Sequence, residues 1–328
     1  MIRWNGWKRG RKMGAQFSGE KIIDPNFSPP DCLISYLGAM TALLRARGIR
    51  CDLTDVAGMS GYAFIINIHP ELLPTGPVAF DWEVLIEGTR ALGVEVELVA
   101  VARGDNDEAN FTELFQRVRE EIEAGRPCIV WGAGDGPQFG LVTGYRQDRY
   151  VVTGAKGKRE EINYDQLKAV WRIAAIFAGE RFEPEYRREE RKAVVRAVRL
   201  LHGTVACFDA EYFSGVRAFS VWGDAVARGR ADYEGLIYNL LCYYELQLLA
   251  AGFCVRLAKK HPQAAPDLKN AAHCFQNSFH NLEQAGKLAS SPAEVRQNSE
   301  PIARLLRACG EQNEQAAGEL ERAFGLME

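Results

Sequence analysis

The sequence lacks a CxxC pair, although its 328 residues include eight cysteines. Zinc sites and disulfide frameworks rely on closely spaced cysteines, so the scatter seen here favours free thiols in a reducing, cytoplasmic environment. No HExxH motif is present among the five histidines. We therefore expect no metal site, and no segment indicates a cofactor.

Long apolar runs and a strong charge imbalance are also missing. No apolar stretch approaches the roughly 18 to 20 residues that span a bilayer, so we expect no membrane partner. The formal net charge is -3, which gives no global support for nucleic-acid binding. The basic run 187–192 is interleaved with glutamates, a pattern typical of a solvated helix face. The glycine-rich turn 132–136 lacks the Gly-Lys-Ser/Thr ending of a phosphate-binding loop.

The pattern of apolar residues divides the chain into an N-terminal extension (1–24), a mixed domain (25–180) and a helical domain (181–328). The mixed domain alternates helical and strand signals, and its later strands are short and separated by polar turns. We expect an α+β domain in which helices pack on an antiparallel sheet. The expected helices are 32–47, 81–92 and 108–124, and the expected strands are 94–101, 128–131, 139–145, 150–152 and 172–178.

Strand signals stop near residue 180, and long amphipathic stretches follow. An all-α second domain is the simplest interpretation, and its exposed helical face can serve self-association into a homodimer. The expected helices lie near 184–206, 208–229, 233–260, 264–289 and 292–323.

Cys32 is the candidate nucleophile. It lies at the expected start of helix 32–47, after Pro29-Pro30 and next to Asp31, which can cap the helix. The free amides of a helix N-terminus lower the pKa of a thiol, whereas a neighbouring carboxylate or burial raises it. The alternative is a small buried residue that packs in the core, as we expect for the other seven cysteines.

Several short segments in a fixed order resemble a known family. They are Pro30-Asp-Cys-Leu33 followed by a helix, Gly125-Arg-Pro-Cys-Ile-Val-Trp131, and the strand Phe139–Tyr145 that ends in Thr-Gly-Tyr. This order resembles the bacteriocin-leader-peptidase type of papain-like cysteine peptidase and, more closely, the N-terminal domain family of butirosin biosynthesis protein H. Members of that family also carry a helical C-terminal domain, whose segments are similar to 215–222 and 238–239 here.

The resemblance implies a papain-like fold and a Cys-His-Asp triad, of which only the cysteine is matched, by Cys32. The position of the family histidine holds Gln138, and the strand that should supply the aspartate, 150–154, contains no carboxylate. Glutamine does not take up a proton near neutral pH, so it cannot act as a general base. It can still hold a thiol, a water or a substrate amide by hydrogen bonds.

Two residues are alternatives for the missing base. His69 is the one histidine of the expected first domain, and Asp135 precedes Gln138 in the glycine-rich turn. Each is otherwise an ordinary loop residue, His69 before a proline and Asp135 in a tight turn. The aromatic and polar residues chosen as candidate ligand contacts are Tyr62, Phe64, Phe139, Trp222, Tyr238 and Asn239.

Three functions follow from these patterns. The first is a papain-like protein that has lost peptidase activity and binds a small molecule or an acyl or peptidyl group. The second is a Cys32-dependent acyltransferase that takes an acyl or peptidyl group from a carrier, as the butirosin protein H resemblance implies. The third is a working cysteine peptidase, which would need a base and an acid that the triad positions do not supply.

Overall fold

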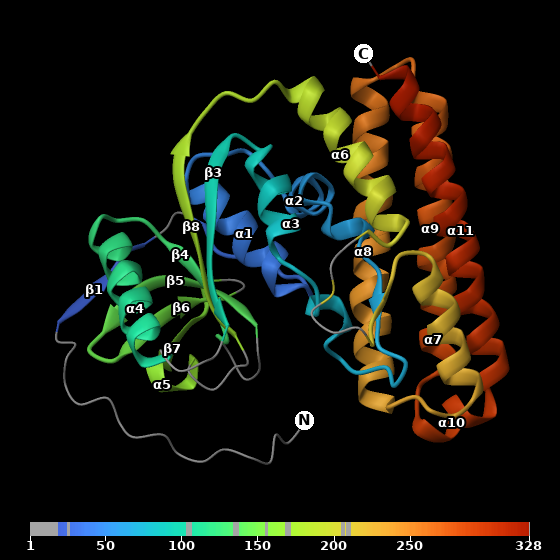
Figure 1. Cartoon of the computed structure of the whole chain (residues 1–328), viewed down its shortest axis with the longest axis horizontal. Coiled ribbons are helices and arrows are strands. Elements are labelled where there is room, and N and C mark those ends of the chain that lie inside the picture. Colours follow the sequence, from blue (N-terminus) through green and yellow to red (C-terminus); the bar gives the residue numbers. More distant parts are fainter. Residues whose placement is uncertain are drawn as a thin grey trace. The chain divides into compact units, whose positions relative to one another are not determined.

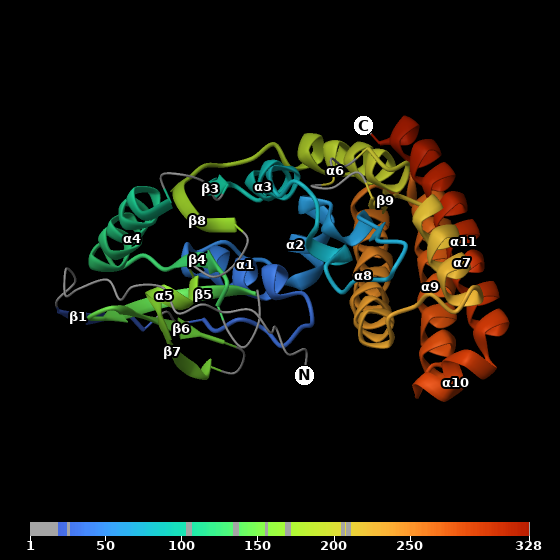
Figure 2. The same cartoon turned by 60° about the horizontal axis from the view of Figure 1, so that its bottom comes forward.

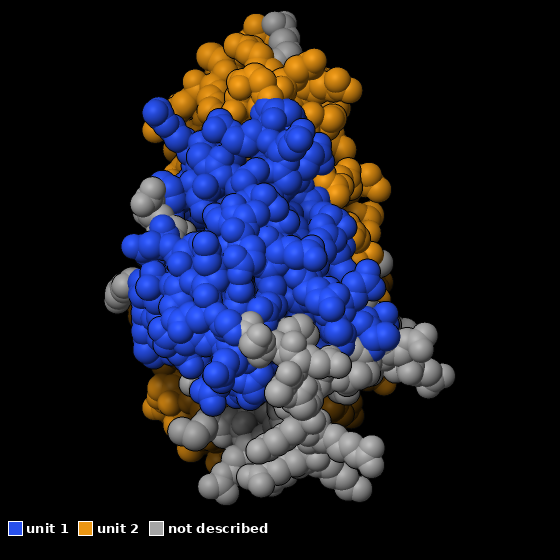
Figure 3. All heavy atoms as spheres, turned by 90° about the vertical axis from the view of Figure 1, so that its left-hand side faces the viewer, with its two compact units in different colours: residues 1–51, 93–182 blue, residues 52–92, 183–328 orange. Residues whose placement is uncertain are grey.

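The computed structural model describes residues 19–24, 27–102, 107–133, 138–154, 157–167, 172–204, 207 and 211–327. The chain forms two compact units, and it passes between them three times. Unit 1 comprises 1–51 and 93–182, and unit 2 comprises 52–92 and 183–328. Figure 3 colours unit 1 blue and unit 2 orange.

Unit 1 is built on an antiparallel sheet (Figure 1). The strands follow the order β3-β8-β4-β5-β6-β7, and β1 pairs with the end of β5. The strands are β1 (Glu20–Ile22), β3 (Val94–Ala102), β4 (Cys128–Trp131), β5 (Phe139–Arg146), β6 (Arg149–Thr153), β7 (Arg159–Asn163) and β8 (Arg172–Arg181).

Two helices cover opposite faces of this sheet, α1 (Ser35–Ala46) and α4 (Asp107–Glu123). Side chains alternate along a strand, so each face of β4 packs on a different helix. Cys128 and Val130 join the apolar cluster beneath α4. Trp131 points to the other face and reaches α1 through the ring of Phe139. Figure 2 shows α4 above strands β5 to β7. The short helix α5 (Tyr164–Leu167) follows β7.

Unit 2 is mainly helical. Helix α9 packs against both α8 and α11, and α11 also packs against α6 and α7. Its helices are α2 (Leu53–Ser60), α3 (Glu83–Arg90), α6 (Tyr186–Leu201), α7 (Arg217–Ala227), α8 (Tyr233–Lys260), α9 (Ala265–Leu288), α10 (Pro292–Gln297) and α11 (Ser299–Leu326). Its short 3₁₀ turns and strands are η1 (Tyr62–Phe64), η2 (Gly76–Val78), β2 (Asn67–Ile68) and β9 (Phe213–Ser214).

Helix α8 is a long helix of 28 residues in unit 2. Among the described residues it is the one helix long and apolar enough to cross a membrane, with a mean hydropathy of 1.3 over its most apolar 18 residues. Of that window, 56% is buried inside the protein, as in the core helix of a globular unit. Gly58 of α2 allows close packing here, because an added Cβ would lie 2.1 Å from the ring of Phe253 on α8.

The expected fold class is confirmed: an α+β part with an antiparallel sheet packed by helices is followed by an all-helical region. Several elements differ from expectation. The extension expected over 1–24 contributes β1 to the sheet, because Glu20–Ile22 pairs with β5. The helix expected over 208–229 begins only at Arg217, since Phe213–Ser214 pairs with β2. The helix expected over 292–323 is two helices that divide at Asn298.

Candidate functional site

Helix α1 begins later than the sequence pattern suggests. Its first residue is Ser35, its N-cap is Ile34, and no side chain caps it. The prediction that Cys32 lies in the first turn and that Asp31 caps the helix is therefore wrong. The N-terminal amides of α1 begin beyond Cys32, so the helix dipole acts on the thiol less directly than expected.

The Cys32 thiol is half-buried against the first turns of α1. It donates a hydrogen bond to the carbonyl oxygen of Ile34 over 3.3 Å, a contact that the protonated form makes and a thiolate cannot. Gly38 leaves room for the sulfur, because an added Cβ there would lie 2.9 Å from Cys32 Sγ and 3.2 Å from the carbonyl oxygen of Pro30.

Hydrogen bonds fix the start of β5 beside α1. The backbone N–H of Phe139 donates to Ser35 Oγ over 3.1 Å, and the rings of Phe139 and Tyr36 meet edge to face at 5.5 Å. The carbonyl oxygen of Gln138 accepts from the N–H groups of Gly132 and Ala133 at 2.8 and 3.0 Å. The peptide group that joins Gln138 to Phe139 is thus held at both its N–H and its carbonyl oxygen, while Gln138 itself is exposed.

The end of β6 is the third part of the site. Thr153 is buried, and its hydroxyl shares a 2.7 Å hydrogen bond with the hydroxyl of Thr143 on β5. The N–H of Gly154 donates to the carbonyl oxygen of Lys158 over 2.8 Å and starts the turn into β7. Within residues 150–154, the chain therefore offers a hydroxyl and backbone groups where the resemblance implies a carboxylate.

These three parts line one cavity of about 310 Å³, which we call the Cys32 cavity. This volume is at the lower end of the range of small-ligand sites. The residues from the three parts that line it include Pro29, Pro30, Cys32, Ser35, Gly38, Ala39, Gln138, Phe139, Thr153 and Gly154. The structure brings together Cys32, Gln138 and Phe139 of the residues proposed from the sequence.

Two charged residues of the cavity were missed by the sequence analysis. Lys158 and Glu160 line it and form an ion pair of 2.6 Å, with side chains 76% and 48% exposed. Glu160 lies on β7 opposite Val152 of β6. The sequence analysis assigned no strand to residues 159–163 and no motif to Lys158, so neither residue was marked.

The groups that line the Cys32 cavity limit the reactions that it can support. It offers a thiol, an amide, hydroxyls and one exposed ion pair, but no histidine among the described lining residues. Within the described residues, no group of three or more His, Cys, Asp or Glu side chains could hold a metal ion. Such a lining can bind polar groups by hydrogen bonds, and it supplies no imidazole to take the thiol proton.

Four of the other thiols are buried in the core. Burial raises the pKa values of Cys242, Cys254 and Cys309 to about 12, and it raises that of Cys128 further. A thiol with such a pKa is almost wholly protonated at neutral pH and reacts slowly. They are packing residues, as expected from the sequence.

His69 belongs to unit 2, and both nitrogens of its ring have hydrogen-bond partners in that unit. Its Nε2 lies 2.9 Å from a carboxylate oxygen of Glu211, and its Nδ1 accepts from the N–H of Glu71 over 3.1 Å. Its side chain is 8% exposed. These contacts leave Nδ1 as the acceptor and Nε2–H as the donor, which is the arrangement of a structural histidine. Asp135, the other alternative base, lies outside the described residues.

Most of the other proposed ligand contacts form the core of unit 2. Phe64, Trp222 and Asn239 are fully buried, and Tyr62 is 1% exposed and donates to the carbonyl oxygen of Pro77. Tyr238 differs, because the residue is 42% exposed.

Comparison with known proteins adds no further constraint on the site: neither the protein-family models nor the curated protein sequences contain a match to this chain.

Proposed function

We propose that unit 1 is a papain-like domain of the bacteriocin-leader-peptidase type that binds a small molecule or an acyl or peptidyl group without cleaving peptide bonds. One observation carries the proposal. Cys32, Gln138 and the end of β6, which correspond to the three triad positions of that family, line a single cavity. Unrelated loops that matched the motifs by chance would have no reason to converge in this way.

The loss of peptidase activity follows from the residues at these positions. Amide cleavage needs a base to take the thiol proton and an acid to protonate the leaving amine. Gln138 can do neither, and Thr153 and Gly154 cannot orient an imidazole as a carboxylate would. The Cys32 thiol instead donates its proton in a hydrogen bond to the carbonyl oxygen of Ile34. What remains is a cavity with an amide, hydroxyls and a thiol, suited to holding a polar group.

Acyl transfer is the second candidate, and the position of Cys32 in the cavity wall favours it. In thioester exchange, the Cys32 sulfur bonds to the acyl carbon, the carrier sulfur departs, and the thiol proton passes to that departing sulfur. An amine then attacks the Cys32 thioester, and its proton returns to the Cys32 sulfur. A thiolate leaves much more readily than an amine nitrogen, so this chemistry needs less acid help than amide cleavage.

A variant that fills the cavity tests the binding proposal. Gly154 has room for a side chain, since the nearest atom to an added Cβ is the carbonyl oxygen of Lys158 at 3.6 Å. We expect Gly154→Leu to abolish binding of short N-acetyl amino-acid amides and acyl N-acetylcysteamine thioesters, followed by saturation-transfer NMR. Gly286→Leu on α9 is the matched control, because its added Cβ meets nothing within 4 Å. Binding that is absent from wild type, or equal in both variants, would refute the proposal.

Intact-protein mass spectrometry separates the two candidates. After incubation with an acyl N-acetylcysteamine thioester at neutral pH, the binding proposal predicts an unmodified chain. Acyl transfer predicts one added acyl group, which Cys32→Ser removes.

A further inference from the structure

Unit 2 contains a second cavity, of about 1010 Å³, along helix α6. Its walls come from α6, from α3 and from the end of α11, all within unit 2, and Figure 1 labels these helices. We call it the α6 cavity. Six cationic side chains line it: Arg187, Arg188, Arg191, Lys192, Arg196 and Arg199. The sequence pattern of this run indicated only a solvated helix face.

The charge of the α6 cavity is opposite to that of the whole chain, whose formal net charge is -3. Three of the cations have carboxylate neighbours. Arg188 lies 3.7 Å from Glu185, Lys192 lies 2.6 Å from Glu189, and Arg196 lies 4.0 Å from Glu87. In the part of the chain that the structure describes, no ion pair joins Arg187, Arg191 or Arg199 to a carboxylate. The cavity therefore keeps an excess of positive charge.

The arrangement of these cations works against the stability of the helix. Arg187 and Arg188 lie in the first turn of α6, where the helix dipole is positive and favours anions. Arg196 is mostly buried at 12% side-chain exposure, and its Nη1 donates to the carbonyl oxygen of Met59 over 2.9 Å. Burial and the neighbouring Arg199 both lower the pKa of Arg196. Sequences break local rules of this kind most often at functional sites.

The α6 cavity also has an apolar part. Val84, Val195 and Leu200 contribute aliphatic surface. Two aromatic side chains at its edge, Tyr186 and Phe324, are 49% and 36% exposed. The guanidinium of Arg191 lies over the ring of Phe324 at 4.9 Å, which holds both side chains at the cavity wall. A ligand for this cavity thus needs an apolar or aromatic body as well as negative charge.

We propose that the α6 cavity binds an organic anion that carries two or more phosphate groups and an apolar or aromatic body. Five of the six cations are arginines, whose planar fork of N–H donors suits phosphate oxygens better than a lysine does. Arg188, Lys192 and Arg196 are four residues apart, so they form a row with steps of about 6 Å along the helix. Arg187, Arg191 and Arg199, which have no ion pair among the described residues, are four and eight residues apart on the same helix and supply the excess positive charge. Such a set of cations fits several linked charges, and the volume lies at the upper end for small ligands.

Calorimetric titration of the full chain tests this proposal with three probes in magnesium-free buffer. ATP supplies an aromatic body, farnesyl diphosphate supplies an aliphatic body, and tripolyphosphate supplies phosphates alone. We expect at least one organic probe to bind tenfold or more tighter than tripolyphosphate, and the tighter of the two identifies the kind of body. Equal affinity for tripolyphosphate, or no binding of any probe, would overturn the proposal.

A charge-reversed pair of variants locates the binding. R191E/R199E changes two cavity arginines, and K269E/R304E makes the same change in charge at exposed positions of α9 and α11 outside the cavity. We expect at least tenfold weaker binding in R191E/R199E and less than twofold change in K269E/R304E, with circular dichroism spectra like wild type in both. Equal losses of affinity in the two variants would mean a diffuse charge effect and would overturn the proposal. A single-stranded oligonucleotide that displaces the probe at lower concentration than ATP would mean a nucleic-acid surface and would equally overturn the proposal.

Discussion

At the scale of single residues, Gln138 decides which reactions the Cys32 cavity can support. Its carbonyl oxygen is anchored through Gly132 and Ala133, and the residue lines the cavity at the position where the family resemblance implies a histidine. An amide in this position can donate and accept hydrogen bonds but cannot move a proton. Under the proposed function, this single residue therefore separates binding from peptide-bond cleavage.

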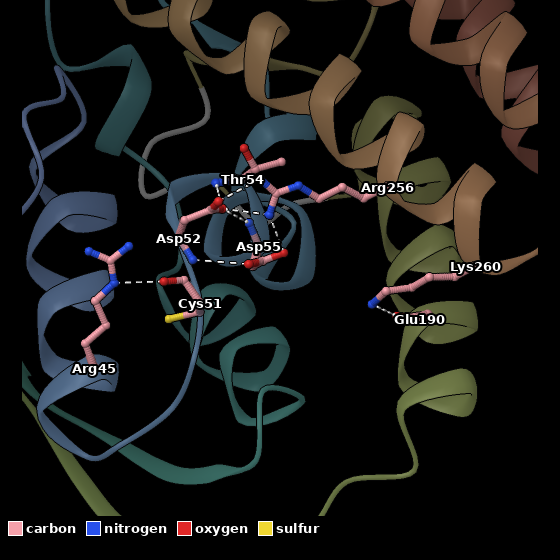
Figure 4. Close-up of polar contacts among 8 residues, drawn as sticks. All are labelled: Arg45, Cys51, Asp52, Thr54, Asp55, Glu190, Arg256 and Lys260. Carbon is pink, nitrogen blue, oxygen red and sulfur yellow. Dashed lines mark hydrogen bonds and ion pairs between the residues drawn. The ribbon is translucent and has the colours of Figure 1, made fainter.

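Asp52 has two roles at the start of α2. Its carboxylate accepts from the N–H groups of Thr54 and Asp55 as the N-cap, and it pairs with Arg256 of α8 (Figure 4). Burial raises the pKa of this carboxyl, but hydrogen bonds from Arg256 and from the two backbone amides outweigh it, so the net pKa lies below its usual range. The charged form is therefore favoured in the folded protein.

Two substitutions separate these roles. Asp52→Asn keeps a capping oxygen and loses the charge, and we expect it to destabilise unit 2 by less than about 1 kcal/mol at pH 7, because the pair is solvent-screened. Asp52→Ala loses both roles, and we expect a further loss of about 1 kcal/mol. A carboxyl group whose pKa is lowered on folding stabilises the folded protein above its unfolded pKa of about 3.9. This stabilisation is lost as the pH falls through the folded pKa. Urea unfolding of wild type and Asp52→Asn should therefore converge below pH 4, and a pH-independent difference would contradict the assignment.

The family resemblance, carried by the segments around Cys32 and Gln138, implied that these two residues share one site, and Phe139 was chosen as an aromatic ligand contact beside Gln138. The sequence analysis missed Lys158 and Glu160 because their position depends on a hairpin whose charged strand has no apolar alternation. It also misplaced the start of α1: Asp31 is a strong capping residue, yet the helix begins after Ile34 without a side-chain cap.

At the scale of elements, the sequence predicts a helix or strand where the segment is long and its apolar residues are regularly spaced. Helix α8 begins at Tyr233 and ends at Lys260, where the sequence indicated, because its long apolar pattern is bounded by Asp232 and His261. Helix α2 was missed, since its eight residues are too few for a clear period. Strand β7 was missed because residues 159–161 are charged and exposed, as is usual for an edge strand.

The packing of α2 on α8 depends on Gly58. We expect Gly58→Ala to destabilise unit 2 by about 1 to 3 kcal/mol, since the added methyl overlaps the ring of Phe253 and the two helices must separate. Gly286→Ala on α9 is the matched control. Its Cβ meets no atom within 4 Å, so the better helix propensity of alanine should stabilise by up to about 1 kcal/mol. Thermal unfolding followed by circular dichroism measures both, and similar effects in the two variants would contradict this packing.

At the scale of the whole molecule, residues 52–92 belong to unit 2 although they interrupt unit 1 in the sequence. Local patterns could not foresee this, because the assignment depends on contacts far apart in the chain. Asn67 shows one of them: its N–H donates to the hydroxyl of Tyr243 over 2.8 Å, and that hydroxyl donates back to the carbonyl oxygen of Asn67 over 2.6 Å.

This assignment predicts the behaviour of fragments. A fragment of residues 183–328 lacks α2, β2 and α3, so Tyr243 and Phe253 lose buried partners. We expect the fragment to keep helical circular dichroism but to unfold without a cooperative transition. Coexpression with a peptide of residues 52–92 should restore cooperativity. A fragment that unfolds as sharply alone, and at the same temperature as the full chain, would mean that 52–92 is not part of the cooperative unit.

The central claim is that the Cys32 cavity has the arrangement of a papain-like site without its base. The most direct test is the rate of iodoacetamide labelling of Cys32 against pH, read by peptide mass spectrometry in wild type and Gln138→His, with Cys242, Cys254 and Cys309 as slow internal controls. We predict a wild-type midpoint at or above the ordinary thiol value of about 8.5, and a midpoint below about 7.5 when an imidazolium can pair with the thiolate. Identical profiles in the two proteins, or a wild-type midpoint already below 7.5, would contradict the account.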